Sequence, residues 1–155
     1  MTEFHPVTGE TVNDFLKMRI LPEQEDFVGS NAVTLAQSIF EPGSEVWGIF
    51  DGKTPVGMVA MIDMAHPDAD LSDGDDPDGI YLWRLLIDKD AQHRGHGRAA
   101  LDFTVARARA LGRAHVALSS VDGPGCAIPF YEAYGFRKTG RIVDDEVCMT
   151  LRPLP

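Results

Sequence analysis

The sequence predicts a single α/β domain, and three observations support this prediction. Residues 80–87 form an almost unbroken apolar and aromatic run, which is typical of a strand buried on both faces. Apolar residues recur at helical spacing over residues 100–111, and a glycine follows where the helix is expected to end. A glycine-rich segment joins the strand to the helix. Hydrophobic residues make up 44% of the 155 residues, and no linker, repeat or low-complexity tract interrupts them, so we expect one domain over residues 1–155.

The part of the chain before this unit contains two helical segments and a hairpin. Residues 11–18 and 22–40 have helical character, and Pro22 followed by acidic residues suits a first helical turn. Two apolar runs, residues 46–50 and 56–62, flank the turn sequence Asp-Gly-Lys-Thr. They predict a β-hairpin.

The part after the helix contains three predicted strands. Residues 114–119 form a short apolar run that directly follows the helical segment. Residues 137–143 and 146–151 read as two closing strands joined through Asp144-Asp145. The predicted strands therefore frame the predicted helices along the chain.

The main functional signal is the glycine loop, which we define as Gln92-His93-Arg94-Gly95-His96-Gly97-Arg98. Its glycines are expected to expose backbone N–H groups at a helix N-terminus, which is a place that attracts phosphate. Two arginines, two histidines and the nearby Lys89 concentrate positive charge here, although the chain has a formal net charge of -10. The loop therefore predicts an anionic ligand.

Spacing distinguishes three known kinds of phosphate loop. A nucleoside triphosphate P-loop needs Gly-Lys-Ser/Thr at its end, but Gly97 is followed by Arg-Ala, which excludes that kind. Residues 95–100 fit the dinucleotide pattern GxGxxA, yet the acid that holds a ribose about 20 residues later is missing from residues 111–121. The third pattern, QxxGxG, starts at Gln92.

With Gln92 ahead of the glycines, the loop resembles the pyrophosphate loop Q/RxxGxG/A of the GNAT-type N-acetyltransferase superfamily. Residues 127–136, AIPFYEAYGF, resemble the second element of that family, AxxxYxxxGF, and the strand at residues 114–119 lies between the two motifs. The resemblance implies a mixed, mostly antiparallel central sheet flanked by helices, with acetyl-CoA as co-substrate. Residues 21–28 and 84–88 also look similar to bacterial spermidine or diamine acetyltransferases.

The resemblance assigns Tyr131 as the general acid that protonates the leaving thiolate. A tyrosine pKa of about 10 exceeds a thiol pKa of about 8.5, so we expect this hydroxyl to act mainly as a hydrogen-bond donor. The alternative is a core tyrosine that packs a helix against the sheet. The backbone of Leu86 and Ile87 is expected to contact the pantetheine arm. The coenzyme pyrophosphate is expected to bind Gln92, His93, Arg94, Gly95, His96, Gly97 and Arg98.

The general base is not evident from the sequence. Many family members carry a carboxylate on the fourth strand, but Tyr81-Leu82-Trp83-Arg84 contains none, and polyamine-type members tend to have an acid where Trp83 stands. The candidates are Asp88, Ser119, Ser120 acting through water, and a carboxylate from a loop. Pro124 also occupies a position that is often asparagine in the family, so a side-chain contact to the cofactor is expected to be missing.

Several other residues have a structural explanation. His93 and His96 lack a cysteine or acid at ligand spacing, so no metal site is predicted. Cys126 and Cys148 lack CxxC spacing and are predicted to be free thiols. Trp47 and Trp83 could line a cation site, but we expect core packing for both.

Charge suggests the class of acceptor. Seven aspartates crowd residues 63–78, which in the family lie near the acceptor end of the cleft. This excess of acid argues against nucleic acid and favours a cationic substrate, with a merely solvated loop as the alternative. We expect acetyl transfer to a primary amine of a small, polyamine-like molecule. The alternatives are acetylation of a protein N-terminus or lysine, and a non-catalytic acyl-CoA-binding regulatory domain.

The first six residues contain no apolar signal region, and no apolar stretch in the sequence approaches the length of a membrane span. We therefore expect a cytoplasmic protein without a membrane partner. Members of the family often pair through their C-terminal strands, so a homodimer is also an expectation.

Overall fold

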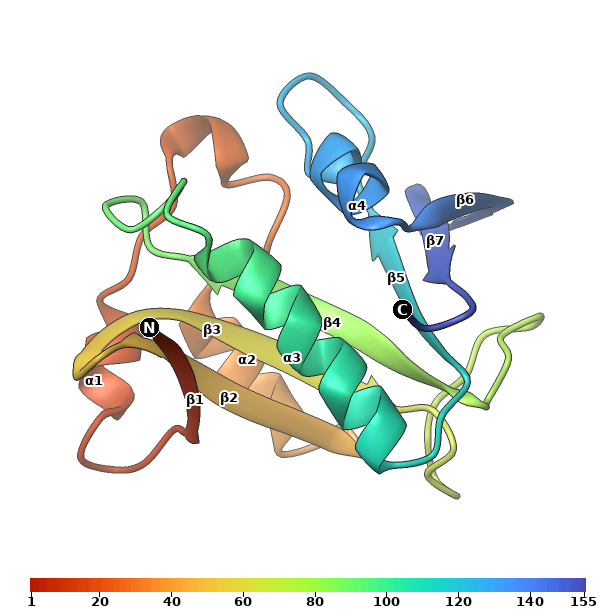
Figure 1. Cartoon of the computed structure of the whole chain (residues 1–155), viewed down its shortest axis with the longest axis horizontal. Coiled ribbons are helices and arrows are strands. Elements are labelled where there is room, and N and C mark those ends of the chain that lie inside the picture. The colour runs from red at the N-terminus through yellow and green to blue at the C-terminus, as the bar shows by residue number, and fades with distance from the viewer.

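The computed structural model describes residues 1–155, and a seven-stranded sheet of order β1-β2-β3-β4-β5-β7-β6 forms its centre (Figure 1). All neighbouring strands pair antiparallel except β4 and β5, which are parallel. This arrangement confirms the predicted α/β fold with a mixed, mostly antiparallel sheet. The strands are β1 (Thr2–Pro6), β2 (Ser44–Asp51), β3 (Thr54–Asp63), β4 (Gly79–Ile87), β5 (His115–Ser120), β6 (Arg137–Val143) and β7 (Glu146–Leu151).

Helices cover both faces of the sheet. In Figure 1 the long helix α3 (His96–Ala110) crosses the near face, while α1 (Val12–Leu16) and α2 (Asn31–Ser38) lie behind it. The strands therefore contribute apolar side chains to two hydrophobic clusters, one on each face of the sheet. The larger cluster joins α3 to the sheet, and the smaller one packs Phe15, Met18, Phe50, Met58 and Leu86 on the α1 side. A short helix, α4 (Ile128–Tyr134), lies beside the N-terminal half of α3, where the Tyr134 hydroxyl binds Asp102.

The helix predicted over residues 22–40 is wrong. Pro22 starts only a short 3₁₀ helix, η1 (Pro22–Gln24), and α2 begins anew after Ser30, whose side chain accepts a hydrogen bond from the Val33 N–H at 3.3 Å. A Gly-Ser pair favours such an interruption, because glycine weakens a helix interior while serine caps a new one. The interruption leaves residues 25–29 free to line the site.

Strand β1 was not predicted, because its stabilising contacts come from distant parts of the chain. It pairs with β2 at the edge of the sheet, and Phe4 stacks on Phe103 of α3 with ring centroids 4.2 Å apart. The turn between β6 and β7 agrees with the prediction. Asp144 and Asp145 have φ values of 51° and 63°, as a two-residue type I′ hairpin turn requires.

Strands β4 and β5 separate partway along their length. They pair only where Gly79–Tyr81 faces His115–Ala117, and beyond that point β5 turns away from β4 (Figure 1). A β-bulge lies next to this fork, because Ala60 faces Arg84 while Met61 faces Leu82, which leaves Trp83 as the extra residue. The fork exposes one edge of β4. None of the helices has the length and apolar character needed to span a bilayer.

Candidate functional site

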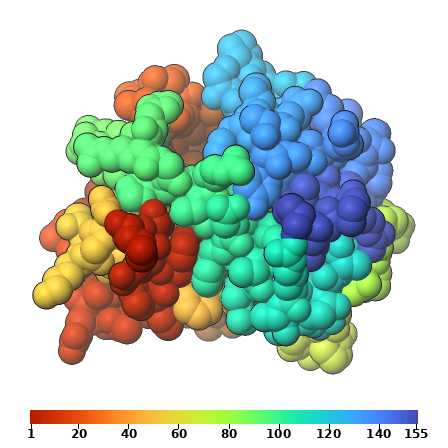
Figure 2. Space-filling view, in the orientation of Figure 1, coloured from red at the N-terminus to blue at the C-terminus, as the bar shows by residue number.

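A cavity of about 1240 Å³ follows the exposed edge of β4. Its walls come from η1 and the residues after it, from β4, from the glycine loop, from the end of β5, from the start of α4 and from the β6–β7 turn. The space-filling view shows a hollow between the glycine loop, in green, and the α4 region, in blue (Figure 2). Segments far apart in the sequence thus meet around one cavity.

The glycine loop lies at the N-terminus of α3. Gly95 is the N-cap residue with φ 89°, a left-handed conformation that favours glycine, and the helix starts at His96. Gly97 lies so close to Phe130 of α4 that a Cβ atom would be 3.2 Å from the ring. The first N–H groups of α3 have no partner within the helix and carry the positive end of its dipole. This end of the cavity is therefore suited to a phosphate group.

The loop residues differ in what their side chains do. All of them line the cavity except Arg94. The His96 ring is only 5% exposed; its Nδ1 lies 2.9 Å from Thr2 Oγ1 and its Nε2 3.9 Å from an Asp51 carboxylate oxygen. Only the backbone of His96 is thus expected to serve an anion. The chain contains no group of three or more His, Cys, Asp or Glu side chains placed to hold a metal.

Gln92 connects the loop to two other parts of the site. Its Nε2 donates to the Ile87 carbonyl at 3.1 Å and to Gln24 Oε1 at 2.8 Å, while its Oε1 accepts from Gln24 Nε2 at 3.2 Å. Gln92 therefore fixes the loop on the end of β4 and on η1. Gln24 was not predicted as a site residue, because no local spacing links two residues 68 positions apart.

Along β4, the backbone N–H and C=O groups of successive residues point alternately toward β3 and toward the open edge at the cavity. The Asp88 N–H binds the Val56 carbonyl of β3, so by alternation Leu86 also faces β3, and its carbonyl oxygen lies against Gly57. The backbone of Leu85 and of Ile87 points to the open edge instead. The contacts predicted from the backbone of Leu86 and Ile87 to the pantetheine arm stay a prediction. Leu85, two residues before Ile87, presents its backbone groups at the same open edge of β4.

Tyr131 places its ring in the core and leaves its hydroxyl unpaired. The ring packs edge-on against Phe136, with centroids 5.7 Å apart, and contacts Phe130. Burial raises the pKa of Tyr131 to about 12, so the hydroxyl is protonated at neutral pH. Tyr131 lines the cavity, and its hydroxyl makes no hydrogen bond within the protein. Its geometry suits a donor to a ligand.

The bulge turns two β4 side chains toward the α2 side of the sheet. The Arg84 guanidinium lies over the Trp83 ring, 4.7 Å from its centroid, and donates to Thr34 Oγ1 at 3.2 Å. Trp83 lines the cavity and belongs to neither hydrophobic cluster, so the core packing predicted for it is wrong. The core packing of Trp47 is confirmed, since its ring meets Phe103 at 5.2 Å.

The candidate bases differ in position. Asp88 does not line the cavity, and its two carboxylate oxygens accept hydrogen bonds from the backbone N–H groups of Arg19 and Asp90. Ser119 and Ser120 do line it, together with Glu146 of the β6–β7 hairpin. Both cysteines are free thiols, as predicted, and burial raises the pKa of Cys148.

Arginines bind three of the seven aspartates of residues 63–78. Asp75 pairs with Arg141 at 3.0 Å and Asp76 pairs with Arg152 at 3.0 Å, while Asp63 binds Arg113 at 2.7 Å. The Arg113 hydrogen bond lowers the pKa of Asp63. Of the seven aspartates, only Asp70 and Asp75 line the cavity.

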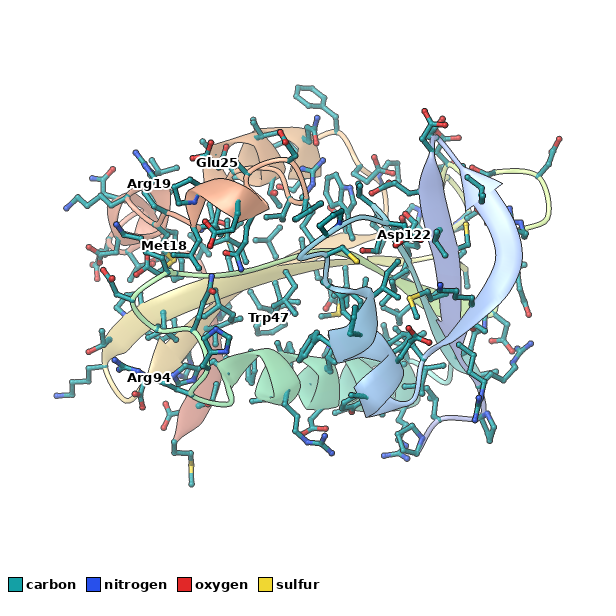
Figure 3. All side chains as sticks on the ribbon, turned by 90° about the horizontal axis from the view of Figure 1, so that it is seen from above. Met18, Arg19, Glu25, Trp47, Arg94 and Asp122 are labelled. Atoms are coloured by element: carbon teal, nitrogen blue, oxygen red, sulfur yellow. The ribbon has the colours of Figure 1, made fainter.

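Acidic residues nevertheless outnumber arginines around the cavity. Figure 3 looks along the sheet and shows Arg94 on the α3 side, with Glu25 on the opposite side beside η1. The cavity is lined by seven acidic residues, Glu25, Asp26, Glu41, Asp70, Asp75, Asp144 and Glu146. Its arginines are Arg84 and, at the glycine loop, Arg98. The glycine loop therefore suits an anion, and the acidic walls of the cavity suit a cation.

Comparisons with known proteins agree with this geometry. Residues 12–136 match the model of the family described as "Acetyltransferase (GNAT) family". No curated protein gives a significant match. An acetyltransferase from Thermus thermophilus superposes with a TM-score of 0.73 at 21% identity, over 97% of this chain and 96% of that one.

Two further solved structures have the same fold. The PaiA N-acetyltransferase from Thermoplasma acidophilum, in complex with coenzyme A, gives a TM-score of 0.69 at 13% identity, over 98% of this chain and 99% of that one. The ribosomal-protein-S18-alanine N-acetyltransferase from Escherichia coli gives 0.66 at 16% identity, over 100% and 96%. At such identities the similarity concerns the fold.

Proposed function

This chain belongs to the GNAT acetyltransferase family, and from that premise we propose that it transfers acetyl from acetyl-CoA to a primary amine of a small, cationic molecule. It is an acetyl-CoA-dependent N-acetyltransferase by family. The acceptor that we propose is polyamine-like. The catalytic unit is proposed to be the whole of residues 1–155, because β1 and β7 are strands of the same sheet.

The observation that carries this proposal is that a helix N-terminus and seven carboxylates line one continuous cavity. The N-terminus of α3 and Arg98 lie at one end, where the coenzyme pyrophosphate would bind the backbone N–H groups of residues 95–98. The seven cavity carboxylates attract a cation to the remainder. A thioester held along the β4 edge would then lie between Tyr131 and the acidic walls.

Direct transfer requires a neutral amine and a stabilised thiolate. An alkylamine of pKa about 10.4 costs about 4.6 kcal/mol to deprotonate at pH 7. Once neutral, the nitrogen attacks the thioester carbonyl and the carbon–sulfur bond breaks. The Tyr131 hydroxyl, which has no other partner, would donate a hydrogen bond to the departing sulfur. Backbone N–H groups on the open edge of β4, at Ile87 and Leu85, would hold the pantetheine arm.

Release of free thiol from acetyl-CoA tests this function. The purified chain is assayed with polyamines, aminoglycosides, amino acids and short peptides, and polyamines are expected to give the highest kcat/KM. Turnover of peptides alone would replace the small acceptor with a protein N-terminus or lysine. Tight acetyl-CoA binding without turnover of any amine would refute the enzyme in favour of a regulatory acyl-CoA-binding domain.

A further inference from the structure

The proposed amine acetylation needs a group that removes a proton from the acceptor ammonium, and β4 offers no carboxylate for it. Asp88, the nearest acid in sequence, is held by backbone N–H groups outside the cavity. The assignment of a base therefore has to come from residues that other strands bring to the fork. It rests on the proposed function.

Three side chains from three strands form a hydrogen-bonded chain at the fork. The Tyr81 hydroxyl of β4 lies 2.5 Å from Ser119 Oγ of β5, and Ser119 donates to Glu146 Oε2 of β7 at 3.3 Å. All three residues line the cavity. Backbone pairing between β4 and β5 ends at Tyr81 and Ala117. The side-chain hydrogen bonds therefore connect the strands where backbone hydrogen bonds no longer do.

The chemistry of the three groups determines which of them donates and which accepts in each hydrogen bond. An ionised Glu146 carboxylate can only accept, so Ser119 uses its single proton to bind it. Ser119 Oγ must then accept from Tyr81, which leaves the lone pairs of the Tyr81 oxygen as the free acceptor at the cavity end. An acceptor N–H group that reaches Tyr81 would therefore meet an oxygen whose own proton points toward Glu146.

Arg84 and the burial of Tyr81 set the charges around this hydrogen-bonded chain. Arg84 forms no ion pair, and its charge acts on both Tyr81 and Glu146. A nearby guanidinium disfavours the ammonium form of a bound amine and so opposes the effect of the cavity carboxylates. Burial raises the pKa of Tyr81, so this hydroxyl is neutral at working pH. The other titratable or charged groups around the chain are Asp75, Tyr131, Arg141 and Cys148.

We propose that Glu146 is the proton acceptor of the acetyl transfer and that it takes the proton through Ser119 and Tyr81. One N–H bond of the ammonium breaks as an O–H bond forms at Tyr81. The original Tyr81 proton moves to Ser119, and the Ser119 proton moves to Glu146, which releases it to water. Tyr81 is the catalytic residue because it meets the amine, while Ser119 and Glu146 are positioning residues. During these coupled proton transfers, neither Tyr81 has to become a phenolate nor Ser119 an alkoxide.

The pH dependence of kcat/KM separates this relay from a structural role. The parent and the variants Glu146→Gln, Ser119→Ala and Tyr81→Phe are assayed between pH 7 and pH 10 with the best amine of the panel. The control is Asp145→Asn, which removes the same charge one residue away, outside the cavity, in a turn conformation that asparagine tolerates. Titration with acetyl-CoA checks that each variant is folded and binds its co-substrate.

We expect Glu146→Gln to lower kcat/KM about 100-fold or more at pH 7, the scale of general base catalysis. The loss should shrink to less than about tenfold at pH 10, where roughly a third of an amine of pKa 10.4 is already neutral. Ser119→Ala and Tyr81→Phe should give the same profile, and Asp145→Asn should match the parent.

Two results would overturn the relay. One is a Glu146→Gln profile that equals the parent, and the other is a loss of the same factor at every pH in all three variants. Both leave the proposed function standing, because the parent still acetylates the amine. If the parent turns over no amine at all, the proposed function fails and the relay fails with it.

Discussion

Replacing Tyr131 with phenylalanine should slow catalysis without weakening acetyl-CoA binding. Burial raises the pKa of Tyr131 to about 12, whereas a thiol titrates near about 8.5. Complete proton transfer to the thiolate is therefore uphill by about 3.5 pKa units, or about 4.8 kcal/mol. The hydroxyl acts instead as a hydrogen-bond donor, and a hydrogen bond to a charged group contributes about 1.5–3 kcal/mol. Tyr131→Phe should thus lower kcat about 10-fold to 150-fold.

The structure supplies a matched control on the same helix. Tyr134 also has a pKa raised to about 12 by burial, but it lies outside the cavity and its hydroxyl donates to Asp102 Oδ1 at 2.7 Å. Tyr134→Phe keeps the ring and should leave kcat within about twofold of the parent, because it removes only a surface hydrogen bond. Because the Tyr131 hydroxyl has no partner in the protein, Tyr131→Phe should not lower the melting temperature.

The assay is steady-state thiol release, with the dissociation constant for acetyl-CoA measured separately by calorimetry. A kcat for Tyr131→Phe within twofold of the parent would refute its role in stabilising the leaving group. Equal losses in both phenylalanine variants would refute it as well, because the effect would then come from the packing of α4. Ionisation of Tyr131 should also produce no fall in kcat below about pH 11, since its pKa is about 12.

Three other predictions follow from charge, burial and backbone geometry. The triple variant Glu41→Gln, Asp70→Asn and Asp144→Asn removes cavity acids that form no ion pair, so kcat/KM for a polyamine should fall several-fold at low salt and little at high salt; a salt-independent effect would contradict steering. Burial lowers the pKa of His115 below its usual 6.5, so the unfolded chain binds more protons and the free energy of unfolding should fall as the pH drops through about 6.5. Urea midpoints at pH 7.5 and pH 5.5 should therefore differ less in His115→Gln, and an unchanged difference would assign the effect to other groups. Gly95→Ala, at φ 89°, should cost about 1–2 kcal/mol of stability in urea unfolding, and a stability equal to the parent would show that the loop can relax.

Local sequence patterns predicted the elements whose stability is local. Strand β4 and the turn at Asp144-Asp145 follow from a continuous apolar run and from a two-residue hairpin link. Strand β1 was missed because its short polar sequence is stabilised by β2 and by the Phe4–Phe103 stack, which no local pattern reveals. The helix over residues 22–40 was wrong because its apolar spacing outweighed the break at Gly29 and Ser30.

The site residues also differ in whether a local sequence pattern could predict them. The glycine loop and Tyr131 belong to continuous motifs, so their positions around the cavity could be predicted, although their roles stay predictions. Glu146 could not be singled out, because it reaches Tyr81 only through Ser119 and each of the three stands on a different strand. The sequence predicted that a loop carboxylate could be the base, but it did not indicate which carboxylate. Asp88 looked suitable by proximity in sequence, yet the Arg19 N–H holds it outside the cavity.

The fork between β4 and β5 explains why both halves of the proposed reaction meet at one point. Once β5 turns away, the β4 edge at Leu85 and Ile87 has backbone groups without a strand to pair with, and a pantetheine arm can use them. The bulge at Trp83 keeps Leu82 and Leu85 in the same core cluster although they are three residues apart, and it leaves Arg84 on the α2 side. A strand without the bulge would send one of these leucines into the acceptor side. The irregularity that a sequence pattern cannot show is thus the feature that separates the donor side from the acceptor side.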